Sequence, residues 1–111
     1  MSGFALHLQS VSQYELIEDV VSFVAEDESG SFGLMAGHAD LMTALSFGLA
    51  RYRQGTETWE YLAIPGGLLH FKDNTCYVTS RTYVRSSDYA NISRILTEQL
   101  MVEEQKLQEL K

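Results

Sequence analysis

Three histidines and one cysteine are the side chains in this sequence best suited to metal binding or nucleophilic catalysis. His7, His38 and His70 stand far apart in the chain, and their spacing matches no ligand motif of a helix or a hairpin. The single Cys76 alternates with Tyr77, which is typical of a strand whose cysteine points into the core. The sequence therefore predicts no metal site, no bound cofactor and no catalytic residue here.

Acidic and glycine-rich segments are the next candidates for chemistry. Glu18-Asp19 and Glu26-Asp27-Glu28 could supply paired carboxylates, but adjacent acids usually lie on a solvated surface, and no carboxylate can be placed opposite them. The segment from Gly30 to Gly37 lacks the Gly-Lys-Ser/Thr ending of a phosphate-binding loop and does not open a helix. Neither segment predicts an active site.

The charge balance restricts the kind of partner that the chain can bind. Its 111 residues include 15 acidic and 8 basic side chains, for a formal net charge of −7. Nucleic acids and anionic lipids attract clustered Lys and Arg, so we expect neither as a partner. No stretch approaches the roughly 20 apolar residues that cross a bilayer, so we expect no membrane insertion. The lone cysteine and the absence of a signal-peptide pattern suggest a cytosolic chain.

Short alternating segments between Phe4 and Val84 must position any functional surface. Phe4, Leu6 and Leu8 alternate with polar or small residues, as a half-buried strand requires. The run Val20–Ala25 is apolar on both faces, so it should lie centrally or beneath a partner. Glycine-containing turns separate the runs at close intervals, and no helical segment intervenes. The pattern predicts an all-β sandwich or barrel.

The pattern changes at Ser86-Ser87-Asp88, whose side chains are good helix N-caps. No Gly or Pro follows, and apolar residues recur at three- and four-residue intervals. They are Tyr89, Ile92, Leu96 and Leu100. We therefore divide the chain into a sandwich of residues 1–86 and a C-terminal helix of residues 87–111. Because an isolated helix of this length is marginal in water, we expect it to pack on the sandwich, or alternatively on a partner.

Two motifs carry a family resemblance. The segment Gly30–Leu45 follows the pattern G-x-x-G-hydrophobic-x-x-G-H-A-x-L-x-T-x-L, and Tyr61–Phe71 enters and leaves the double glycine Gly66-Gly67 through apolar residues. Both motifs, at this spacing, resemble the epsilon subunits of F-type ATP synthases, whose mitochondrial counterpart is called delta. The resemblance implies a mainly β fold, a flattened sandwich of about ten strands followed by α-helix.

The resemblance also implies a function and a set of sites. Family members are non-catalytic rotor subunits that bind the gamma subunit and the c-ring, peripherally, at the cytoplasmic face of the inner membrane. The positions that match the gamma-facing side are Ser10, His38, Ala39, Met42 and Thr43. Those that match the c-ring side are Asp27, Glu28, Ser31 and Phe32. The glycines expected to shape the loops are Gly30, Gly33, Gly37, Gly48, Gly66 and Gly67.

The sequence departs from the family in its C-terminal part. Only one helix fits between Asp88 and Lys111, whereas relatives carry a helical hairpin, so we expect a shortened helical part and no inhibition by insertion of such a hairpin into the catalytic head. The nucleotide-binding pattern D-x-x-R-A is broken at Asp88, because the arginine is displaced to Arg94. We also expect that the isolated protein can self-associate through its uncovered face.

Two other classes of function remain open from the sequence alone. A small-ligand or carbohydrate-binding sandwich would need a concave pocket lined by aromatic residues such as Trp59, Tyr61 or Tyr77. A small hydrolase ranks last, because no catalytic constellation is present.

Overall fold

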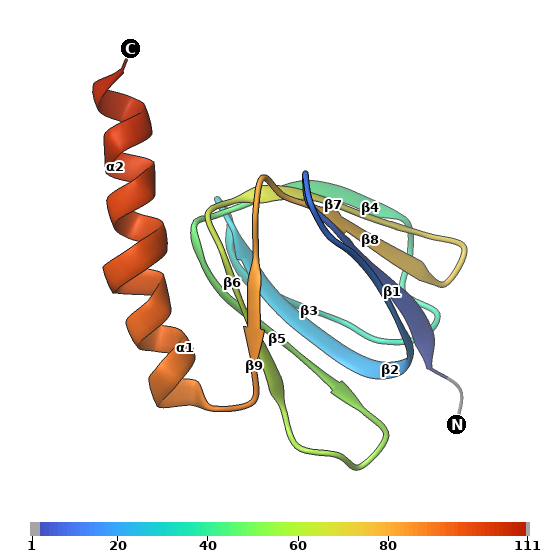
Figure 1. Cartoon of the computed structure of the whole chain (residues 1–111). Helices are drawn as coiled ribbons and strands as arrows, with labels where there is room; N and C mark the ends of the chain where they lie inside the picture. The colour runs from blue at the N-terminus through green and yellow to red at the C-terminus, as the bar shows by residue number, and fades with distance from the viewer. Residues whose placement is uncertain (1–2, 111) are drawn as a thin grey trace.

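The computed structural model describes residues 3–110, which form a β-sandwich followed by one C-terminal helix (Figure 1). The strands are β1 (Phe4–Gln9), β2 (Tyr14–Asp27), β3 (Gly30–Leu34), β4 (Leu41–Leu45), β5 (Gly48–Gln54), β6 (Glu60–Ile64), β7 (Gly67–Lys72), β8 (Thr75–Thr79) and β9 (Val84–Ser86). The helix comprises α1 (Tyr89–Ile95), a π-helical turn η1 (Leu96–Leu100) and α2 (Met101–Glu109). The predicted fold class is confirmed, with nine strands in the described residues.

The long strand β2 belongs to both layers of the sandwich. Its first half pairs with β1, and its second half pairs with β5 on one side and β3 on the other. Asp19 has a positive φ of 57°, and the register shifts beside Val20, so a bulge bends the strand between the two layers. The prediction that Val20–Ala25 lies centrally is confirmed.

The two layers have different neighbours outside the core. The layer that we call the β1 layer contains the first half of β2 with β1, β8, β7 and β4. The β5 layer contains the second half of β2 with β3, β5, β6 and β9. A single pair, Asp27 with Leu45, links β4 back to β2. The helix lies against β6 and β9, so it covers part of the β5 layer only (Figure 1).

Alternation of apolar residues along the strands builds the core between the layers. Phe4 packs edge-on against Phe71, with ring centroids 5.3 Å apart. Leu6, Tyr52 and Cys76 are also buried. The prediction that Cys76 points into the core is confirmed, and burial raises the pKa of its thiol to about 12. Such a thiol is a poor nucleophile at neutral pH.

The double glycine is needed where the chain enters β7. Gly66 has a φ of 118°, which side chains rarely tolerate, and its carbonyl accepts a 2.5 Å hydrogen bond from the Ser80 hydroxyl. A Cβ atom on Gly67 would overlap the carbonyl oxygen of Thr79. The close approach of β7 and β8 at this point therefore excludes any side chain.

The helix begins at its predicted cap. The Asp88 carboxylate accepts a hydrogen bond from the backbone N–H of Asn91 at 3.1 Å. Ile92 and Leu100 are buried against Ala63 of β6, so the apolar stripe packs on the chain's own sandwich, as predicted. The helix thus forms a second, smaller core outside the β5 layer.

The π-helical turn η1 was not predicted. Ile92, Leu96 and Leu100 are four residues apart, and each such step advances about 40° beyond a full α-helical turn. A wider turn between Leu96 and Leu100 reduces this drift, so that Leu100 stays over the sheet. Beyond it, α2 has no buried residue and extends past the sandwich (Figure 1). Ion pairs of Arg81 with Glu104, at 2.8 Å, and with Glu103, at 3.9 Å, connect the start of α2 to the sandwich.

Candidate protein-docking site

The outer face of the β1 layer carries a continuous row of apolar and aromatic side chains. Strand register places one residue from each of five strands in line, in the order Leu16, His7, Tyr77, His70 and Met42. Residues directly opposite in neighbouring strands point to the same face, so these five side chains share one surface. We call this set the aromatic row.

Aromatic contacts hold the centre of the row. The His7 ring stacks on Tyr77 with centroids 4.7 Å apart and an angle of 18° between the planes. His70 lies on the other side of Tyr77, at 6.4 Å and 43°. The His7 Nδ1 atom and the Tyr14 hydroxyl share a 2.5 Å hydrogen bond. These contacts fix the rotamers of the central side chains before any partner binds, which lowers the entropic cost of docking.

The aromatic row is exposed and carries no carboxylate, although the chain as a whole is acidic. Met42 is 60% exposed, Leu16 48% and Tyr77 45%. Leu68 and Tyr14, in the next row of outward positions, are also exposed. Exposed Met and aromatic side chains are typical of the centre of a protein interface, where charged residues are depleted. The face is therefore suited to protein docking.

The structure places the five residues predicted to face gamma in different settings. Met42 belongs to the aromatic row and points outward, while Leu41 packs against the core. His38 and Ala39 are exposed in the turn before β4, where the His38 ring lies edge-on to Phe71. The remaining two residues, Ser10 and Thr43, have their hydroxyl groups occupied within the chain.

Ser10 is buried in the turn between β1 and β2. Its Oγ accepts hydrogen bonds from the backbone N–H groups of Ser12 and Gln13, at 3.3 and 3.1 Å. The strand register aligns Met42, near the start of β4, with His7 in the middle of β1. Ser10 follows the end of β1 and His38 precedes the start of β4, so the two residues lie at opposite ends of the β1 layer. The aromatic row lies between them. Ser10 therefore shapes the edge of the face without presenting a free hydroxyl.

Sequence reasoning missed four of the five members of the aromatic row. Outward apolar residues in the strands, such as Leu16 and Tyr77, were the available signal. Whether such residues form one surface depends on the parallel pairing between β1 and β8, which aligns His7 with Tyr77 across 70 residues of chain. No local pattern specifies that register.

The residues predicted to face the c-ring lie at the β2–β3 hairpin. The Asp27 carboxylate accepts hydrogen bonds from the Ser29 backbone N–H at 2.9 Å, the Ser29 hydroxyl at 2.5 Å and the Thr43 hydroxyl at 2.6 Å. The hydrogen bonds from the Ser29 and Thr43 side chains lower the pKa of Asp27. The hairpin tip is thereby fastened to β4.

The other three residues of that set divide between surface and core. Glu28 and Ser31 are exposed, and Glu28 lies in the two-residue turn itself. Phe32 is half-buried and packs against the core, so only part of its ring is open to a partner. The tip therefore presents Glu28 and Ser31 on a rigid base.

The six glycines selected from the sequence differ in what the fold requires of them. Gly30 and Gly37 have positive φ values of 117° and 82° and turn the chain beside β3. Gly48 starts β5, and nothing lies within 4 Å of where its Cβ would stand. Gly33, expected to allow a reversal or close approach, instead lies within β3 without a positive φ and with only ordinary contacts. Gly33 therefore has no geometric need for glycine.

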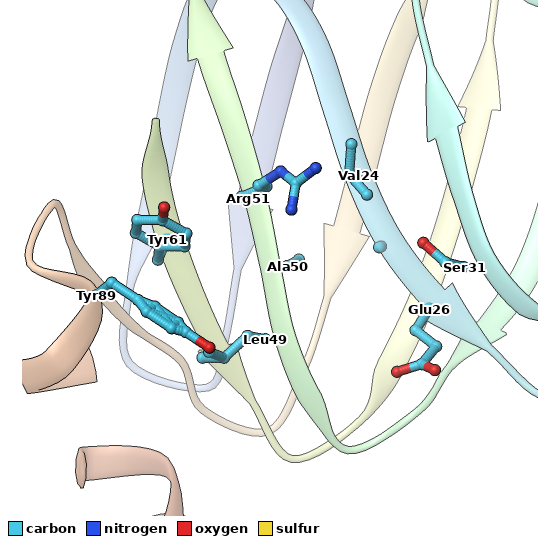
Figure 2. Close-up of a pocket in the computed structure, with 9 residues that line it drawn as sticks. Val24, Glu26, Ser31, Leu49, Ala50, Arg51, Tyr61 and Tyr89 are labelled. Carbon is cyan, nitrogen blue, oxygen red and sulfur yellow. The ribbon is translucent and has the colours of Figure 1, made fainter. Parts of the chain in front are cut away.

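The three aromatic residues that a ligand-binding sandwich would need in one pocket do not lie together. Tyr77 lies on the β1 layer, whereas Tyr61 lines a half-open pocket of about 290 Å³ on the β5 layer (Figure 2). Trp59 lies beside Arg51 and Arg53. Tyr77 separates His7 from His70, and residues 3–110 contain no group of three His, Cys, Asp or Glu side chains that could hold a metal ion.

A partly buried polar cluster joins the start of β2 to β5 and β9. The Tyr83 hydroxyl donates to Glu15 at 2.8 Å, and Arg85 contacts both the Glu15 carboxylate, at 2.9 Å, and the Tyr52 hydroxyl, at 2.7 Å. Burial, followed by the Glu15 contact, raises the pKa of Tyr83 to about 12. Every member has a partner, so the cluster joins β2, β5 and β9 and needs no ligand.

Comparison with known protein families identifies this arrangement. Residues 5–86 match the family model described as ATP synthase, Delta/Epsilon chain, beta-sandwich domain. The chain belongs to this family. The matched residues contain the nine strands of the structure except Phe4, the first residue of β1, and with them the aromatic row and the β2–β3 hairpin.

Relatives of this family chain include bacterial epsilon chains. ATP synthase epsilon chain 2 of Cereibacter sphaeroides is 46% identical over 52 residues, which are 47% of this chain and 36% of that protein. The ATP synthase epsilon chain of Syntrophomonas wolfei is 30% identical over 87 residues, covering 78% of this chain and 64% of its own length. The chain therefore covers about one third to two thirds of the length of these relatives.

Chains in two solved ATP synthase structures share the fold. A chain in the cryo-EM structure of the Euglena gracilis mitochondrial ATP synthase, OSCP/F1/c-ring, superposes with a TM-score of 0.71 at 20% identity, covering 88% of this chain and 64% of that one. A chain in the Tetrahymena thermophila mitochondrial ATP synthase central stalk/c-ring structure gives a TM-score of 0.62 at 15% identity, covering 73% and 65%. Within residues 3–110, no helix of this delta/epsilon-type chain is long and apolar enough to span a membrane.

Proposed function

We propose that the chain is a non-catalytic rotor subunit of the central stalk of an F-type ATP synthase. In this role it links the gamma subunit to the c-ring and transmits torque between them, peripherally, at the cytoplasmic face of the inner membrane. The aromatic row is the observation that carries the proposal. It gives a family member a row of five outward side chains without a carboxylate on an otherwise acidic molecule.

The two predicted interfaces fit this role. The aromatic row with His38 and Ala39 provides the face for gamma, and the β2–β3 hairpin tip with Glu28 and Ser31 provides the contact for the ring. The carboxylates at the tip suit basic groups on the polar loops of a ring, where such charges mainly speed and orient association. Hydrogen bonds within the chain fasten the tip, so force applied there reaches the body of the sandwich.

A charge placed in the aromatic row tests the proposal. Met42→Asp should weaken binding of the isolated gamma subunit at least about tenfold, because an interface would bury an unpaired carboxylate. Val102→Asp is the matched control, since Val102 is 42% exposed on α2, away from the row. It should stay within about twofold of the wild type. Affinity can be measured by surface plasmon resonance, with circular dichroism to show that both variants fold.

Equal gamma binding by Met42→Asp and the wild type would refute the aromatic row as the gamma face. Failure of the wild-type chain to bind gamma at all would refute the rotor role itself.

A further inference from the structure

Two arginines on the outer face of β5 lie against the only tryptophan of the chain. The Cζ atom of Arg51 is 4.6 Å from the centroid of the Trp59 ring, and that of Arg53 is 5.1 Å away. Both distances are typical of cation–π contacts. These contacts hold the two guanidinium groups in place while leaving N–H groups free to donate.

Neither guanidinium has an acidic partner in residues 3–110. The other arginines, Arg81, Arg85 and Arg94, each form an ion pair within 4.0 Å, whereas Arg51 and Arg53 form none. The Arg53 Nε atom is buried without a hydrogen-bond partner among the described residues. Two neighbouring unpaired cations in a chain of net charge −7 indicate a ligand that supplies negative charge.

A pocket with apolar and polar walls continues the line of the two arginines. Leu49, Arg51 and Arg53 alternate along β5, so their side chains share the outer face of the layer. The pocket of about 290 Å³ lies at Leu49 and Arg51, and Val24, Tyr61 and Tyr89 form its apolar walls (Figure 2). Glu26 stands at the far rim of this pocket, where it would repel an acidic side chain (Figure 2). The side of the pocket formed by Val24, Leu49 and the two tyrosine rings therefore suits an apolar side chain.

We propose that this surface docks an extended acidic segment of a partner protein, with an apolar residue two positions from one acid and four from a second. The spacing follows from the strand, because alternate residues are about 6.6 Å apart both in β5 and in an extended ligand. The apolar side chain fills the pocket, one carboxylate meets Arg51, and the other meets Arg53. Guanidinium groups bind carboxylates in a planar, two-pronged geometry, which favours Asp or Glu.

This site is independent of the proposed gamma face. It lies on the β5 layer beside α1, whereas the aromatic row lies on the β1 layer. Either site can therefore fail its test without affecting the other.

Trp59 provides a direct readout of docking. We would titrate the chain with the peptide acetyl-Leu-Thr-Glu-Thr-Glu-Thr-amide and follow Trp59 emission. The expected result is a saturable change that is absent with the matched peptide in which both Glu residues are Gln. Replacing the peptide's Leu with Ser should weaken binding about tenfold, because the pocket then stays empty.

Variants distinguish the site from general attraction to positive charge. Arg51→Gln and Arg53→Gln should each weaken peptide binding about tenfold or more, as expected for loss of a charge-assisted pair. Lys72→Gln removes one exposed cation from the β1 layer and should change affinity less than about twofold. Circular dichroism of each variant should match the wild type.

Several results would overturn the proposal. They are equal losses for Lys72→Gln and Arg51→Gln, equal binding of the Gln peptide, or no change in Trp59 emission. Competition by inorganic phosphate at the same concentration as the peptide would identify a small-anion site instead. Concentration-dependent dimerisation of the wild type, abolished by Arg53→Gln in sedimentation experiments, would identify a second copy as the occupant.

Discussion

Shortening Ile92 to alanine should release the helix from the β5 layer. Ile92 has no exposed surface and packs with Leu100 and Ala63. The substitution removes three carbons, worth about 0.8 kcal/mol each, and the residual cavity raises the total to about 3 kcal/mol. Because a helix of this length gains little stability by itself, most of this loss should fall on its docking.

Amide hydrogen exchange measures this opening residue by residue. A loss of about 3 kcal/mol should speed exchange of the α1 and η1 amides roughly 100-fold, since each 1.4 kcal/mol is a factor of ten. Amides of β7 and β8, in the main core, should keep most of their protection. Leu107→Ala is the matched control, because Leu107 is 42% exposed on α2, and it should change exchange by about twofold at most.

The comparison of these two variants can refute the reasoning. If Ile92→Ala changes exchange of the helix no more than Leu107→Ala does, the small core around Ala63 does not hold the helix. If the strands lose protection as much as the helix does, the helix is not a separately opening unit.

Three further predictions concern the sandwich. Gly67→Val should prevent folding or cost more than about 3 kcal/mol, measured by urea unfolding, because its Cβ would overlap the Thr79 carbonyl, whereas Gly33→Val should be tolerated. The lowered pKa of Asp27 means that its ionised form stabilises the fold above about pH 4 and that this contribution disappears as the pH falls through the lower folded value. The unfolding midpoints of the wild type and Asp27→Asn should therefore differ at pH 6 and converge near pH 2; a constant difference would contradict this. The Cys76 thiol, with its pKa raised to about 12, should react with dithiobisnitrobenzoate at pH 8 only as fast as the protein opens, and rapid reaction would contradict its burial.

The fold was predictable where local pattern decides the structure. Alternation identified the inward residues of β1, and the cap at Asp88 identified the start of the helix. Gly66-Gly67 marked a point where backbone strain and close approach leave no other choice. The π-helical turn was missed because α-helical periodicity was assumed throughout, although the four-residue spacing from Ile92 to Leu100 already departs from it.

The docking face was predictable only in part, since it depends on long-range register. Alternation implies that one of Leu41 and Met42 points outward, and the structure shows that it is Met42. The alignment of Met42 with His70, and of Tyr77 with His7, requires the order of β4, β7, β8 and β1, which no local pattern contains. The arginine pair was visible as alternation in β5, but its missing acidic partners are a property of the folded surface.

A single strand connects the two interfaces proposed for the rotor role. Strand β2 contributes Leu16 to the aromatic row near its start and ends in the hairpin tip at Asp27. It is paired along most of its length, with β1 over its first half and with β5 and β3 over its second half, and the Asp27–Thr43 hydrogen bond of 2.6 Å ties the tip to β4, the strand that carries Met42. A sideways force on the tip therefore acts on many backbone hydrogen bonds at once rather than on one flexible loop. Under the proposed function, this continuity is what allows a small sandwich to transmit torque, because the contact with the ring cannot move without moving the face that binds gamma.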